Sequence, residues 1–267
     1  MKKYLSFFKI RFSNGLQYRV AAYAGVITQF AWGIMEILMF KAFYKANPTA
    51  FPMGFSQLSS YIWLKQAFIA LFMLWFWEED IFSAVSSGNV AYELIRPMDL
   101  YNMWFMKNMA SRLSKAVLRC IPILIIAALI PQPYGISLPN DFLSFFSFII
   151  SMILAFLVVV SFCMMIYITT FYTLSPLGIK VIFIALVEFL SGSIIPIPFL
   201  PDKIASILEI LPFASMQNMP LRIYSGNIAG MDMLYAILLQ VFWLVVLVVV
   251  GKVFMKKSLK KVVIQGG

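Results

Sequence analysis

The sequence predicts an all-α integral membrane protein. We expect six transmembrane helices, an amphipathic interface helix before the first of them, and an outer re-entrant helical hairpin between the fifth and the sixth. Hydrophobic residues make up 62% of the chain and charged residues 12%, whereas soluble proteins are about half apolar and a quarter charged. Six apolar segments each approach the roughly 20 residues that cross a bilayer. We treat residues 1–267 as a single membrane domain.

Charge and residue types exclude several classes of function. The net charge is +10, but the basic residues flank apolar segments, which indicates orientation in a membrane rather than binding of nucleic acid. The chain has no histidine, so it lacks the commonest metal ligand and acid–base group. Cys120 and Cys163 lie in apolar segments and are expected to be free thiols, not a disulfide or metal site. We expect no metal and no cleaved signal peptide.

Residues 1–18 predict the interface helix. Leu5, Phe8 and Phe12 recur at helical spacing on one face, while lysines and serines occupy another. This pattern is typical of a helix that lies in the membrane surface with its lysines toward lipid phosphates. A basic tail that only fixes the topology is the alternative.

The six spans follow from the lengths of the apolar runs. They are residues 20–43, 58–77, 110–130 (kinked at Pro122), 142–170, 177–195 and 234–254. Basic residues gather in 2–19, 96–119 and 252–261, which share one side of a six-span protein, and that side is therefore cytoplasmic. We expect a multi-pass protein of the prokaryotic plasma (inner) membrane with both termini in the cytoplasm.

The cytoplasmic stretch 78–109 is the longest on that side, and we name it the coupling region. A turn at 86–89 precedes a short element that ends at Pro97, because the residue before a proline avoids helical geometry. Asp99 is expected to cap the next helix. A short exposed helix of this kind suits a membrane subunit that receives force from a soluble motor. A connector with no partner is the alternative.

Residues 180–227 begin as a membrane helix and are then broken repeatedly. Prolines interrupt the helix, a short apolar-periodic segment follows, and a further proline precedes PLRIYSGN. Interrupted helices at membrane depth are typical of a pathway or a gate. We name 196–227 the outer hairpin, with arms at 204–211 and 215–224 that form a lid. The candidate outer-gate residues are Pro196, Pro201, Pro212 and Gly226.

Three ionisable side chains lie within predicted spans: Glu36, Lys65 and Glu188. Glu36 and Lys65 fall at similar depths, so they are expected to form an ion pair that relieves the cost of isolated charges. Lys65 extending alone toward the outer surface is the alternative. Glu188 lies near mid-membrane, where it either lines a transport route or senses protons, or serves as a structural acid.

Two stretches are similar to ABC-2 type transporter permeases. GNVAYELIRPMDL at 88–100 resembles their first cytoplasmic loop, and SGSIIPIPFLPDKIASILEILPFASMQNMPLRIYSG at 191–226 resembles their connection between spans five and six. The six-span layout, interface helix and basic C-terminus also match, so the resemblance covers the whole chain. It implies the membrane subunit of an ATP-driven exporter, with a separate ATPase dimer, a second permease of the same or homologous sequence, and surrounding lipid. The chain has no GxxxxGK[ST] run, so ATP and Mg²⁺ would be held by the partner.

The resemblance places the ATPase-coupling element at 88–97, with Glu93 and Arg96 as the contacts. The candidate coupling residues are Gly88, Glu93, Arg96 and Pro97. Alternatively, Glu93 and Arg96 form a solvated ion pair one helical turn apart.

The expected function is export of a hydrophobic or amphipathic substrate, such as a drug, peptide or lipid-like compound. The alternative is a proton-coupled secondary transporter that uses Glu188. An intramembrane enzyme is disfavoured, because the sequence lacks histidine, paired catalytic carboxylates on one helix and an HExxH motif.

Overall fold

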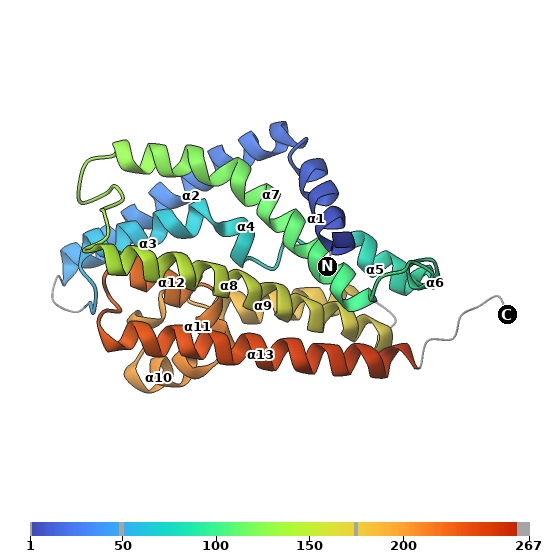
Figure 1. Cartoon of the computed structure of the whole chain (residues 1–267). Helices are drawn as coiled ribbons and strands as arrows, with labels where there is room; N and C mark the ends of the chain where they lie inside the picture. The colour runs from blue at the N-terminus through green and yellow to red at the C-terminus, as the bar shows by residue number, and fades with distance from the viewer. Residues whose placement is uncertain (1, 48–50, 174–175, 261–267) are drawn as a thin grey trace.

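A computed structural model describes residues 2–47, 51–173 and 176–260 (Figure 1). Lys261, at the end of the predicted basic flank, lies outside this part of the chain. The described residues form helices and short turns, with no strand among them. The all-α prediction is therefore confirmed for the part of the chain that the structure describes.

The first half of the described chain contains seven helices. They are α1 (Lys2–Gly15), α2 (Arg19–Ala46), α3 (Phe55–Ala67), α4 (Ile69–Phe72), α5 (Glu79–Ser86), α6 (Val90–Leu94) and α7 (Leu100–Leu129). The second half contains six more, together with 3₁₀ turns at Thr170–Tyr172 and Ile197–Phe199. They are α8 (Phe142–Thr169), α9 (Pro176–Leu190), α10 (Asp202–Ile210), α11 (Pro212–Met216), α12 (Asn218–Tyr224) and α13 (Met231–Leu259).

The long helices run side by side, and α8 lies among them. Helix α8 contacts α13, α12, α7 and α11. Most of its apolar stretch is buried inside the molecule, as expected for a helix that is hydrophobic on every side. Figure 1 shows α5 and α6 at one end of the bundle, with the N-terminal helix near them, and α10 toward the other end.

Among the residues that the structure describes, three helices are long and apolar enough to cross a membrane: α2, α8 with its terminal turn, and α13. They match the first, fourth and sixth predicted spans. The prediction of one continuous helix over 58–77 is wrong, because α3 ends at Ala67 and the chain leaves helical geometry after the single turn of α4. At 13 residues, α3 alone is shorter than a bilayer crossing.

The third and fifth predicted spans also differ from simple crossing helices. Helix α7 begins within the coupling region and carries several basic residues along its length. Pro122 lies inside it, and Figure 1 shows the helix bending, as expected where a proline removes a backbone donor. Helix α9 has 15 residues and ends at Leu190, and Gly192 then adopts a φ of +77° that turns the chain.

The outer hairpin comprises α10, α11 and α12. Pro212 begins α11 as expected from its fixed φ, but the predicted second arm is not continuous, since it breaks at Gln217. Gly226 has a φ of +76°, and a Cβ on it would lie 2.4 Å from the Asn140 side chain. Helix α10 is mostly exposed, whereas α12 is buried against α8 and α3.

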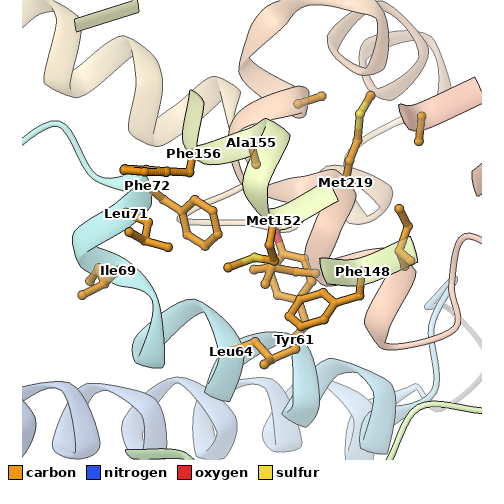
Figure 2. Close-up of a cluster of buried hydrophobic side chains, with 14 of the residues drawn as sticks. Tyr61, Leu64, Ile69, Leu71, Phe72, Phe148, Met152, Ala155, Phe156 and Met219 are labelled. Carbon is orange, nitrogen blue, oxygen red and sulfur yellow. The ribbon is translucent and has the colours of Figure 1, made fainter. Parts of the chain in front are cut away.

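A buried apolar cluster joins these elements (Figure 2). It combines aromatic and methionine side chains from α3, α4, α8 and α12, and methionine fills the irregular space that broken helices leave. The cluster includes Tyr61, Leu64, Ile69, Leu71, Phe72, Phe148, Met152, Ala155, Phe156 and Met219. The short helices α4 and α12 are therefore fixed by packing, since neither is long enough to be stable alone.

The predicted cap at Asp99 is present, and its removal should destabilise α7. The Asp99 carboxylate accepts a hydrogen bond from the Asn102 backbone N–H at 2.9 Å. Asp99→Ala should lower the free energy of unfolding by about 1 kcal/mol, measured by denaturant titration in detergent. Asp99→Asn, which can still cap the helix, is the matched control. An equal loss in both variants would show that the capping bond is not the cause.

Candidate functional site

The first candidate site is the exposed end of the bundle formed by α5 and α6. Gly88 joins the two helices at a φ of +75°, a conformation that costs glycine little and other residues more. Val90 is buried, while Tyr92 and Ile95 are 70% and 78% exposed. Helix α6 is thus anchored on one side and presents apolar side chains to the surroundings on the other.

Glu93 and Arg96, the two charged residues at 88–97, differ in their contacts. The Glu93 carboxylate accepts a hydrogen bond from Trp104 Nε1 at 2.5 Å, which holds α6 against α7. Arg96 is exposed, as is Pro97. The alternative of a Glu93–Arg96 ion pair is not present among the ion pairs of the described residues.

Ion pairs connect α5 to two other helices. Asp80 pairs with Lys107 of α7, whose side chain is 3% exposed. Glu79 pairs with Lys180 of α9. A displacement of α5 and α6 would therefore be transmitted directly to α7 and α9.

The interface helix α1 is attached to the same region. Lys3 Nζ donates a hydrogen bond to the Pro97 carbonyl oxygen. The backbone N–H of Asp99 donates to the Tyr4 hydroxyl at 2.9 Å. Helix α1 also packs along α7, so it is connected to both the exposed element and a long helix.

A buried arginine closes the break after α4. Arg112 on α7 is 1% exposed, and its guanidinium donates hydrogen bonds to the backbone carbonyl oxygens of Ala70, Leu71, Met73 and Phe76. The shortest of these bonds, to Met73, is 2.7 Å. Carbonyl groups freed at the end of a helix need donors, and a cation is favourable near a helix C-terminus.

A second layer of polar contacts positions Arg112. Asn108 accepts a hydrogen bond from Arg112 Nε at 2.7 Å and donates to the Tyr167 hydroxyl at 2.9 Å. The same hydroxyl accepts from the backbone N–H of Glu78 at 2.9 Å. The break between α4 and α5 is thus closed by side chains from α7 and α8.

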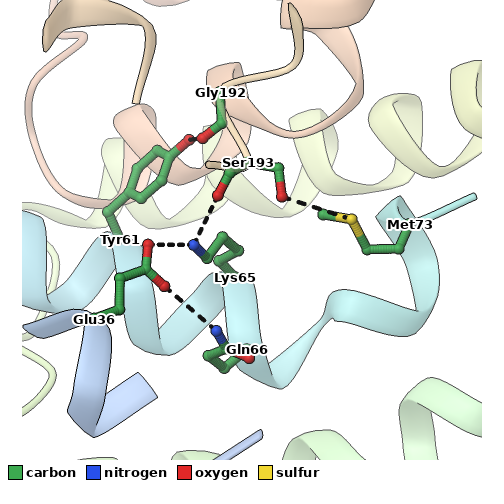
Figure 3. Close-up of polar contacts among 7 residues, drawn as sticks. All are labelled: Glu36, Tyr61, Lys65, Gln66, Met73, Gly192 and Ser193. Atoms are coloured by element: carbon green, nitrogen blue, oxygen red, sulfur yellow. Dashed lines mark hydrogen bonds and ion pairs between the residues drawn. The ribbon is translucent and has the colours of Figure 1, made fainter. Parts of the chain in front are cut away.

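The second candidate site is a polar cluster deeper in the bundle (Figure 3). Lys65 on α3 forms an ion pair with Glu36 on α2, and their side chains are 6% and 13% exposed. Lys65 also donates to the Ser193 carbonyl oxygen at 2.9 Å. The Tyr61 hydroxyl donates to the Gly192 carbonyl oxygen at 3.1 Å. Side chains of α3 therefore satisfy the backbone of the turn that follows α9.

The ion pair between Glu36 and Lys65 is the arrangement that their similar depths predict. Lys65 points into the bundle, so the alternative in which it extends alone toward the outer surface is wrong. Glu188 on α9 does not join this cluster by an ion pair. Its carboxylate accepts a hydrogen bond from the Trp75 indole N–H, beside the break after α4.

The outer-gate residues are distributed over the outer hairpin. Pro196 is buried, Pro201 is exposed, and Pro212 and Gly226 are half-buried. Arg222 of α12 pairs with Glu209 of α10. The Trp243 indole N–H of α13 donates to the Ile210 carbonyl oxygen at 2.8 Å. These contacts connect the two arms to each other and to α13.

A family model described as "ABC-2 family transporter protein" matches residues 30–266. The chain belongs to the ABC-2 transporter family. A search of curated proteins gives no match for the chain. Membership makes this chain a transmembrane transport subunit and implies association with an ABC ATPase. The match covers the coupling region, Arg112 and the outer hairpin, and it begins after α1.

Sequence reasoning missed two features of this ABC-2 permease. Tyr92 and Ile95 lie three residues apart and opposite the buried Val90, so helical spacing was a usable signal for their exposure. Arg112 was counted only as a basic residue at the cytoplasmic end of a span. Its contacts come from residues about 40 positions away in sequence, and no local pattern shows them.

Proposed function

We propose that this chain is the permease of an ATP-driven ABC exporter, moved by a separate ATPase dimer that contacts α6. The observation that carries this proposal is the exposed apolar surface of Tyr92 on α6 and of Ile95, which caps its C-terminus, on a helix that is fixed to the bundle. A helix of this kind, inserted into a groove, provides anchors at helical spacing. Arg96 flanks these anchors and remains a proposed contact, while Glu93 holds the helix in place.

We further propose six membrane crossings, of which the second and fifth are broken. The second is α3 with α4 and the chain to Trp77, and the fifth is α9 with the turn after it. Backbone of this kind is tolerated at membrane depth where protein satisfies it, as Arg112 and Lys65 do here. Both termini and α6 would face the cytoplasm of a prokaryotic cell, and α10–α12 would re-enter from outside.

The proposed transport stroke follows the ion pairs. Movement of α6 displaces α5, and the pairs with Lys107 and Lys180 carry it to α7 and α9. The turn after α9 then pulls on Lys65 and hence on α2 and α3. A hydrophobic or amphipathic substrate would pass between this permease and a second one and leave beside the outer hairpin, with ATP and Mg²⁺ confined to the ATPase.

The contact with the ATPase is tested by placing a charge at the C-terminal end of α6. Ile95→Asp should reduce recovery of the ATPase in a mild-detergent pulldown by roughly tenfold or more, because it places a charge in an apolar contact and the hot-spot anchors of an interface each contribute about 2 kcal/mol or more to binding. The matched control is Leu138→Asp, since Leu138 is 88% exposed and lies outside the coupling region. Wild-type recovery with Ile95→Asp would contradict the proposed contact.

Substitution of Glu188 separates ATP-driven export from the proton-coupled alternative. In Glu188→Gln the amide oxygen can still accept from Trp75, so ATP-dependent transport in vesicles should stay within about twofold of the wild type, as is usual for substitutions that keep local contacts. A carrier that needs a titrating carboxylate would lose proton-coupled transport instead. Abolished transport at a normal ATPase rate would contradict the proposal.

A further inference from the structure

A cavity of about 400 Å³ lies where α1, α2 and α7 meet. Its walls include Gly15 at the end of α1, Tyr18 just before α2, Ala21 of α2, and Lys115 and Arg119 of α7. Ligand sites in proteins start at about 300 Å³, so this cavity is large enough to hold a small polar group. It belongs neither to α6 nor to the outer hairpin.

Two cations on one face of α7 define the chemistry of this cavity. Lys115 and Arg119 are four residues apart, so they lie side by side on the helix and repel each other. Both are above the Phe76 ring, at 5.4 and 5.3 Å from its centroid. Neither takes part in an ion pair in the part of the chain that the structure describes.

Arg119 is held in place while one of its buried donors remains unpaired. Its Nε is buried and has no hydrogen-bond partner among the described residues. The guanidinium lies directly against Gly25 of α2, where an added Cβ would be 2.8 Å from the guanidinium carbon. A buried guanidinium donor without an acceptor is costly, which indicates that an acceptor binds beside it.

The charge of the lining selects the kind of anion. Glu78 also borders the cavity, but it forms no ion pair with either cation among the described residues. Two cations and one carboxylate leave a formal charge of +1. A singly charged phosphodiester neutralises this charge, and Arg donors match phosphate oxygens.

We propose that this cavity binds the phosphodiester group of an anionic glycerophospholipid such as phosphatidylglycerol. Basic pockets between membrane helices on the cytoplasmic side are typical sites for lipid headgroups. Beside the cavity on α2, Val20 and Tyr23 are 84% and 59% exposed, and they provide an apolar surface for acyl chains. The bound lipid would connect α1, α2 and α7, and this role is independent of the ATPase.

Lipid titration of the purified chain tests the proposal. Delipidated protein in detergent is titrated with phosphatidylglycerol, and the thermal unfolding midpoint is followed. Phosphatidylglycerol should raise the midpoint saturably, whereas diacylglycerol, which has no phosphate, should not. Lys115→Gln and Arg119→Gln should each raise the apparent Kd about five- to tenfold, the usual effect of losing one cation near an anionic lipid surface.

Two further variants keep the test decisive if an α7 variant folds poorly. Ala21→Leu fills the cavity while leaving both cations, and it should also weaken the response to phosphatidylglycerol. Lys252→Gln removes a cation that lies 6.0 Å from the Tyr101 ring centroid, outside the cavity, and should bind the lipid like the wild type.

Three outcomes would overturn the proposal. Wild-type affinity in Lys115→Gln, Arg119→Gln and Ala21→Leu would show that lipid binds elsewhere. An equal rise in the apparent Kd for phosphatidylglycerol in Lys252→Gln would show a general effect of the chain's positive charge. Equal stabilisation by water-soluble glycerophosphoglycerol would show a site for a free phosphodiester instead of a lipid.

Discussion

Arg112→Met is expected to prevent accumulation of folded protein. The substitution leaves the four backbone carbonyl groups beyond α3 without the guanidinium that they contact. Each buried polar group left unpaired costs about 1–3 kcal/mol, so the summed loss is at least about 4 kcal/mol. Because native proteins are stable by only about 5–15 kcal/mol, the folded fraction should fall sharply. Size-exclusion chromatography in mild detergent and the thermal unfolding midpoint measure this.

Two companion variants show whether the carbonyl contacts are the cause. Arg112→Lys keeps the charge but has fewer donors on a compact head, so it should recover only part of the lost stability. Arg96→Met removes an exposed arginine outside these contacts and should fold like the wild type. A monodisperse Arg112→Met protein with a wild-type midpoint would refute the role assigned to this arginine.

Glu36→Gln is expected to destabilise the chain by about 3–5 kcal/mol, because it leaves the Lys65 ammonium buried beside a neutral amide. The double variant Glu36→Gln with Lys65→Met removes both charges and should regain most of this loss. A double-mutant cycle on denaturant unfolding in detergent measures the coupling between the two residues.

Lys41→Gln on α2 is the matched control for the second prediction. Lys41 is exposed and lies 4.8 Å from the Tyr134 ring centroid, so its replacement should change stability by less than about 1 kcal/mol. Two results would contradict this prediction. Either Glu36→Gln lowers the free energy of unfolding no more than Lys41→Gln does, or the double variant is the least stable of all. In both cases the ion pair between Glu36 and Lys65 does not stabilise the contact between α2 and α3.

The sequence was most informative where a property is local. Helices α2, α8 and α13 follow from the length of uninterrupted apolar runs, and Asp99 caps α7 because a short acceptor precedes a helical segment. The positions of Glu36 and Lys65 along their predicted spans put them at similar depths, and the two side chains do form an ion pair. Family membership was likewise predictable from two motifs in the correct order.

The breaks in the chain were less predictable, since they depend on distant residues. Residues 68–77 are as apolar as a continuous helix would be, so composition gives no sign of the end of α4. The guanidinium of Arg112 supplies the donors that make a break there tolerable. Likewise, Glu93 was assigned to the surface because its partner Trp104 lies on the following helix.

The ion pairs of α5 have a consequence for the effect of ionic strength. Glu79 and Asp80 are more than half exposed, and the distance beyond which salt screens exposed charges falls from about 10 Å at 0.1 M to about 3 Å at 1 M, which is close to the length of an ion pair. The contacts of Arg112 with carbonyl groups are buried and are screened much less. Concentrated salt would therefore loosen the attachment of α5 and α6 while the helices below stay packed, and under the proposed function it would weaken the connection between the permease and its ATPase without unfolding the chain.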